Sequence, residues 1–76
     1  MQDVVQNKVY DHYKGGKYLV LFVAQDSTNA RQHNKVVVYI SLTYGEVKCR
    51  DVFEFTEIVE WPDGSQKPRF IMTEKF

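Results

Sequence analysis

Residues 35–44 read Lys-Val-Val-Val-Tyr-Ile-Ser-Leu-Thr-Tyr, and this stretch decides the fold class. Its even positions are all apolar or aromatic, whereas its odd positions mix Lys, Val, Tyr, Ser and Thr. Such alternation is typical of a β-strand with one buried face. We therefore predict a strand whose core-facing residues are Val36, Val38, Ile40, Leu42 and Tyr44. An aspartate at Val38 would then be an unpaired buried charge, and it should unfold the domain.

The neighbouring segments also have the composition of strands. Residues 18–24 are apolar on both faces and rich in Val, Leu and Phe, which favours a central strand. Alternation lapses over 51–55, where we expect a short helical turn. On the strand that precedes this turn, the pattern places Cys49 with Val47 on the core-facing side. The whole chain is predicted to form five strands, near 17–25, 35–44, 46–51, 56–61 and 69–73.

The breaks between these strands have the residues of tight turns. Gly45 separates two strand-like runs and is able to take a positive φ in a hairpin. Residues 61–64, Trp-Pro-Asp-Gly, suit a type I turn. Residues 26–34 have no large apolar side chain and are expected to form an exposed loop. Five short strands with close turns predict an all-β, strongly bent antiparallel sheet that closes into a small barrel.

Length and composition place these strands in one small domain. The chain has 76 residues, with ten basic and ten acidic side chains. We expect a loose N-terminal arm over 1–8 and a single barrel domain over 9–76. The N-terminus lacks a basic stretch followed by an apolar run, and the longest apolar run has six residues. With one cysteine, which suits a reducing interior, these features predict a soluble cytoplasmic protein without a membrane segment.

The residue types needed for catalysis or metal binding do not gather in the sequence. There are two histidines, His12 and His33, and no Cys-x-x-Cys or His-x-x-x-His spacing. A metal site would require both histidines and Cys49 to meet by folding. No nucleophile elbow is present, and residues 15–17 lack the upstream glycine of a phosphate-binding loop. We therefore expect no catalytic residues, no metal, no cofactor and no enzymatic activity.

Charge is distributed unevenly along the neutral chain. Up to Arg50 there are seven basic and four acidic residues, whereas three basic and six acidic residues follow it. All five tyrosines lie in the basic part. Aromatic residues among cations are typical of single-stranded nucleic-acid binders. The alternative is that these tyrosines fill the barrel with their hydroxyls at its rim.

Several motifs together resemble the small bacterial family of unknown function DUF1653, over roughly residues 9–70. They are Tyr-Asp-His-Tyr-Lys-Gly at 10–15, Tyr-Leu-Val-Leu at 18–21, Val-Val-Tyr at 37–39, Leu42 with Tyr-Gly at 44–45, and Pro-Arg-Phe at 68–70. The resemblance implies a compact barrel of SH3-like type. It implies no activity, because none is established for the family.

A candidate ligand site follows from alternation and from the same motifs. We predict one polar patch at the barrel mouth, formed by His12, Lys14, Tyr18, Arg50 and Arg69. Guanidinium groups beside a tyrosine suit a carboxylate or phosphate. The alternative is that the two arginines pair with Asp51 or Glu57 and brace the barrel.

Two functions follow as hypotheses from the fold and this patch. The first is a non-catalytic binding or interaction module for a peptide, protein or anionic ligand. The second is a nucleic-acid-binding domain that uses the basic, tyrosine-rich first two-thirds of the chain.

Overall fold

The computed structural model describes residues 4–27 and 34–73, which form seven strands and one helical turn. In chain order they are β1 (Val9–His12), β2 (Lys17–Gln25), β3 (Lys35–Ser41), β4 (Val47–Asp51), α1 (Val52–Phe55), β5 (Ile58–Glu60), β6 (Gln66–Pro68) and β7 (Phe70–Met72). The predicted helical turn is confirmed as α1, whereas β1 and β6 were not predicted. The predicted loop over 26–34 falls largely outside the described residues. No helix in the described ranges is long and apolar enough to span a membrane.

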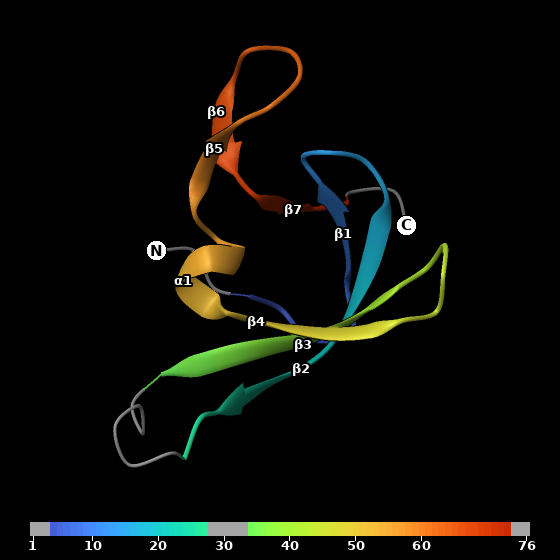
Figure 1. Cartoon of the computed structure of the whole chain (residues 1–76), viewed down its shortest axis with the longest axis vertical. Helices are drawn as coiled ribbons and strands as arrows, with labels where there is room; N and C mark the ends of the chain where they lie inside the picture. The colour runs from blue at the N-terminus through green and yellow to red at the C-terminus, as the bar shows by residue number, and fades with distance from the viewer. Residues whose placement is uncertain (1–3, 28–33, 74–76) are drawn as a thin grey trace.

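Five strands form one antiparallel sheet in the order β4-β3-β2-β1-β7, and β5 pairs with β6 in a separate hairpin (Figure 1). The all-β antiparallel fold is therefore confirmed, with more strands than predicted. Within residues 4–27 and 34–73 no backbone pairing joins the edge strands β4 and β7. Closure of the sheet into a barrel stays a prediction.

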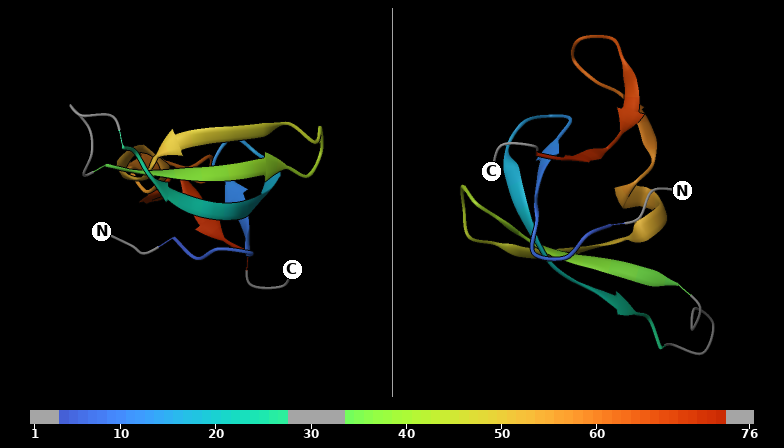
Figure 2. Two further views of the ribbon diagram at one scale, coloured as in Figure 1. Left: turned by 90° about the horizontal axis from the view of Figure 1, so that it is seen from below. Right: turned by 180° about the vertical axis from the view of Figure 1, so that it is seen from behind.

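The sheet bends at β2. The register between β2 and β3 shifts between Val20 and Phe22, so that Leu21 forms a bulge. Residues 17–19 before the bulge pair with β1, and residues 22–25 beyond it pair only with β3. A bulge bends its strand and increases its twist. Figures 1 and 2 show the result, in which the β1–β2 hairpin rises out of the plane of β3 and β4 and the sheet gains a concave face.

The predicted core face of β3 is wrong by one residue. The buried side chains are Val37, Tyr39 and Ser41, whereas Val36, Val38 and Ile40 are partly exposed. The prediction depended on Leu42 and Tyr44, which lie beyond the end of the strand and are exposed. Both faces of 36–40 are apolar, so alternation does not decide between them without those two residues.

The strand ends early because Ser41 begins a turn. Its hydroxyl accepts the backbone N–H groups of Thr43 and Tyr44 at 3.3 and 3.1 Å, and its carbonyl accepts that of Gly45 at 2.8 Å. Gly45 has a φ of 71°, as the sequence predicted for this hairpin. These bonds satisfy the polar atoms of Ser41 on the buried face.

The same shift of register moves Cys49 to the outer face. Cys49 pairs with Val38, and Val47 pairs with Ile40, so all four lie on the convex side of the sheet. Cys49 and Val47 are exposed. The prediction that both face the core is wrong, and Lys48 and Arg50 instead point toward the concave face.

The concave face encloses an aromatic core. Phe55 and Phe70 stack with their ring centroids 4.0 Å apart, and Tyr10 and Tyr39 each meet Phe55 edge-on at 5.5 Å. All four are buried. Offset and edge-to-face contacts of this kind stabilise aromatic cores beyond the area they bury. The helical turn α1 therefore joins β1, β3 and β7 into one unit.

Residues 4–8 lie along the sheet and do not form a loose arm. Val4 packs against the core, and the backbone N–H of Val5 donates to the hydroxyl of Tyr10 at 2.9 Å. Asn7 donates to the carbonyl of Val20 at 2.8 Å, and the side chain of Gln6 accepts the N–H of Val23. The predicted arm is thus attached from residue 4 onward, and residues 1–3 lie outside the described part.

The hairpin between β5 and β6 confirms the predicted turn at residues 61–64. The N–H of Gly64 donates to the carbonyl of Trp61 at 2.8 Å, and Gly64 has a φ of 87°. Asp63 accepts the N–H and the hydroxyl of Ser65, which holds the turn. In Figure 1 this hairpin projects away from the main sheet.

Candidate functional site

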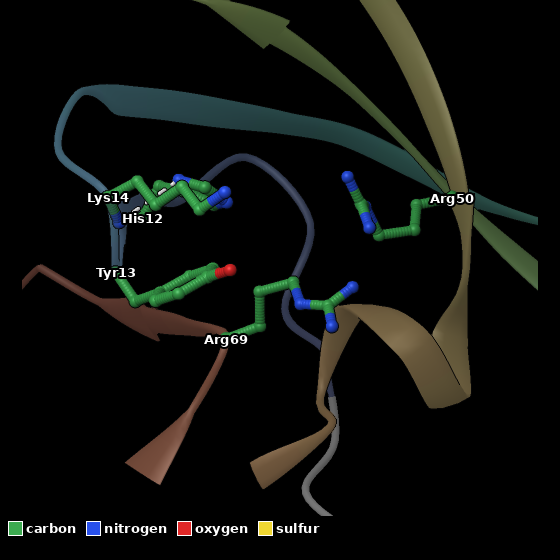
Figure 3. A pocket seen from close by; sticks show the side chains of 5 residues that line it. All are labelled: His12, Tyr13, Lys14, Arg50 and Arg69. Carbon is green, nitrogen blue, oxygen red and sulfur yellow. Dashed lines mark hydrogen bonds between the residues drawn. The ribbon is translucent and has the colours of Figure 1, made fainter. Parts of the chain in front are cut away.

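A shallow pocket of about 230 Å³ opens where the edges of the bent sheet approach one another (Figure 3). Its lining consists of His12, Tyr13, Lys14, Arg50 and Arg69. Four of the five side chains predicted from the sequence therefore come together. Figure 3 shows the two guanidinium groups on one side of the pocket, facing the side chains from 12–14 on the other.

The fold explains why residues distant in sequence converge here. His12 is the last residue of β1, and the following turn presents Tyr13 and Lys14. Arg50 pairs with buried Val37, so both side chains point to the concave face. Arg69 lies between β6 and β7, immediately before the buried Phe70. The pocket therefore lies between the two edge strands of the sheet, β4 and β7. The end of β1, which pairs with β7, contributes His12.

His12 is packed between rings and is largely neutral at pH 7. Its ring centroid lies 4.7 Å from that of Phe70 and 4.9 Å from that of Tyr13. Its Nδ1 accepts the backbone N–H of Lys14 at 3.3 Å, so in the neutral ring Nε2 carries the proton. Burial lowers the pKa of His12, and the positive charges of Arg50, Arg69, Lys14 and Lys48 lower it further.

Arg50 is held in place by aromatic residues. Its Nε donates to the hydroxyl of Tyr39 at 3.4 Å, and its guanidinium lies 6.0 Å from the ring centroid of Phe70. The bond to Tyr39 is the main cause that raises the pKa of Arg50, so the group stays charged. Its terminal nitrogens make no hydrogen bond within the described part of the chain.

Arg69 is partly a brace, as the alternative hypothesis predicted. Its Nη2 donates to the carboxylate of Glu57 at 2.7 Å, and its backbone N–H donates to the carbonyl of Glu57 at the same distance. Glu57 is exposed, so the ion pair contributes only about 0–1 kcal/mol. The Nε of Arg69 is buried and has no acceptor among the described residues. An unpaired buried donor is costly to the folded protein.

Tyr18 lies behind the pocket and does not line it. Its ring meets those of His12, Tyr39 and Phe70 edge-on at 5.8, 5.5 and 5.6 Å. It thus supports His12 from the core side. Sequence reasoning did not select Tyr13, although the signal was present: Tyr13 stands between His12 and Lys14 in the same motif.

The side chains of the pocket supply hydrogen-bond donors and positive charge. None of its lining residues is an acid. No group of three or more His, Cys, Asp or Glu able to hold a metal occurs within residues 4–27 and 34–73, and His33 lies outside them. The arrangement suits recognition of an anion.

Stability should decrease as the pH falls below the ordinary histidine value of 6.5. His12 has a lower pKa in the folded protein than in the unfolded chain, so below 6.5 the unfolded chain binds more protons. The contribution of His12 to stability is fully present above pH 6.5 and is lost as the pH falls through the pKa of His12 in the folded protein. Urea unfolding at pH 7.5 and 5.5 measures this loss. His12→Asn keeps a side-chain acceptor for the N–H of Lys14 and should reduce the difference in stability between the two pH values. An unchanged difference would show that His12 is not the group responsible.

The comparisons with known proteins agree with this fold. A search of curated proteins found no match. The chain is similar to a DUF1653 protein from Bordetella bronchiseptica of known crystal structure, with 32% sequence identity and a TM-score of 0.70, over 91% of this chain and 87% of that one. The sequence also matches the family model of DUF1653, a protein of unknown function, over residues 8–72. The chain therefore belongs to the DUF1653 family.

Proposed function

We propose that this protein is a non-catalytic binding module that holds an anionic group of its ligand in the pocket. The observation that carries the proposal is the convergence of Lys14, Arg50 and Arg69 in a pocket without an acid in its lining. Like charges repel one another, so cations held close together destabilise the folded protein unless a negative charge offsets the repulsion. Glu57 compensates Arg69, and an anionic ligand would compensate the others.

The placement of the tyrosines supports this function over nucleic-acid binding. Tyr10 and Tyr39 are buried in the core, and Tyr18 packs against it. Tyr44 is 79% exposed but lies in the β3–β4 turn and does not line the pocket. Nucleic-acid binders stack successive bases on exposed rings beside cations, and here three of the five tyrosine rings serve the core. Nucleic acid is therefore the second candidate.

We further propose that the bent sheet closes into a small SH3-like barrel. The stacking of Phe55 on Phe70 supports this, because it links α1, which follows β4, to β7 at the opposite edge. The cytoplasm is the compartment we propose, since the exposed thiol of Cys49 would be open to oxidation elsewhere.

Titration with simple oxyanions followed by NMR tests the proposed function. Acetate, sulfate and phosphate should shift the resonances of His12 and Lys14, and the shifts should weaken with added salt. Arg50→Gln should weaken binding about tenfold, as expected for loss of a charge-assisted hydrogen bond. Lys8→Gln removes an exposed cation outside the pocket and should have no effect.

Two results would contradict the proposal. Absence of any shift at millimolar anion in low salt would exclude an anion site, provided that the parent protein is folded. Tight, salt-sensitive binding of labelled single-stranded DNA or RNA that Arg50→Gln leaves unchanged would favour the nucleic-acid function.

A further inference from the structure

The pocket holds more hydrogen-bond donors than the protein itself uses. The unused donors are the terminal nitrogens of Arg50, the ammonium of Lys14 and the hydroxyl of Tyr13. Lys14 only lies over the Tyr13 ring, 5.6 Å from its centroid, and none of these groups bonds to an acceptor in the described part of the chain. A ligand that satisfies them needs several acceptor oxygens on one small group.

The net charge of the pocket can be counted from its residues and their partners. Glu57 neutralises Arg69, which leaves the positive charges of Lys14 and Arg50. Two residues act at longer range with opposite signs: Lys48 lowers the pKa of His12, whereas Glu54 raises that of Arg50. With His12 neutral, the remaining charge matches that of a dianion.

We infer that the anionic group bound in the pocket is a dianionic phosphate, either free or as the terminal phosphate of a monoester. This inference rests on the proposed function and specifies its ligand. Three terminal oxygens offer acceptors to Arg50, Arg69 and Lys14 at once, whereas a carboxylate has only two oxygens and one charge. The pocket is open to solvent, so the organic part of a phosphate monoester can extend out of it.

His12 provides a reporter that is independent of affinity. A bound dianion favours the imidazolium, so it should raise the pKa that Arg50, Arg69 and Lys14 lower in the free protein. The pKa of His12 followed by NMR should therefore rise when phosphate binds. Binding elsewhere on the surface would leave it unchanged.

The test compares three ligands that share a phenyl ring and differ in the head group: phenyl phosphate, phenyl sulfate and benzoate. At pH 7.5 the phosphate is mainly a dianion, because its second pKa is about 6. Calorimetry at low salt should give phenyl phosphate at least about tenfold tighter binding than either monoanion. Arg50→Gln should abolish most of this preference, and Lys8→Gln should preserve it.

The outcomes separate the inference from the proposed function. Equal binding of the three ligands at the pocket would overturn the phosphate assignment and leave the anion-binding function intact. No binding of any of them, together with no response to acetate, sulfate or phosphate, would overturn both. Inorganic phosphate distinguishes the two sources: affinity equal to that of phenyl phosphate assigns the site to free phosphate, and weaker affinity assigns it to a monoester.

Discussion

Val37→Asp should leave the protein unfolded at room temperature. Val37 has an exposure of 0% on the concave face of β3, and it lies in the same core cluster as Tyr39 and Phe55. Arg50, opposite on β4, points to the same face, but its guanidinium is already held by Tyr39 and Phe70, so burial of the new carboxylate still costs several kcal/mol. That cost is comparable with the whole stability of a small domain, which is about 5 kcal/mol. Circular dichroism and the dispersion of NMR signals measure the loss.

Val38→Asp is the matched control, one residue further along the same strand. Val38 is partly exposed and pairs with Phe22 and Cys49, which are both exposed on the convex face. This variant should stay folded with a modest decrease in melting temperature. If Val37→Asp stayed folded and Val38→Asp unfolded, the result would support the core face predicted from alternation and contradict the one seen in the structure.

Phe55→Ala should have the second-largest effect, a destabilisation of about 3–5 kcal/mol. The ring of Phe55 is fully buried and stacks on Phe70, with Tyr10 and Tyr39 edge-on at its sides. Its removal leaves a cavity among side chains from three strands, and α1 loses its main contact with them. Chemical denaturation of the parent and the variant measures the difference.

Phe53→Ala is the control within the same helical turn. Phe53 is 61% exposed, so its truncation should change the stability by no more than about 0.5 kcal/mol. Equal effects of the two substitutions would show that burial does not set the size of the loss. They would then contradict the central place of Phe55 in the core.

The parts of the fold that the sequence predicted are those with strong local signals. Gly45 and Gly64 mark turns that need a positive φ, and the apolar run over 18–24 lies in the central strand β2. The strands β1 and β6 were missed because each is short and half polar, and their pairing partners stabilise them. Local pattern does not contain that information.

The candidate site was also predicted only in part from the sequence. Alternation and the family motifs together selected His12, Lys14, Arg50 and Arg69, which the fold brings to one pocket. Alternation alone does not distinguish a residue on the concave face that lines the pocket from one that fills the core. Tyr18 is of the second kind, because its ring is surrounded by other rings of the core.

The pairing of β1 with β7 has a consequence for folding kinetics. Tyr10 lies opposite Met72, so nearly all of the described chain separates the two partners. The hairpins between β1 and β2, β2 and β3, and β3 and β4 close short loops, whereas docking of β7 must close the longest one. Phe70 reaches the core only in that step. We therefore expect the four-strand meander to form early and the docking of β7 to be the late step that limits the appearance of the native state.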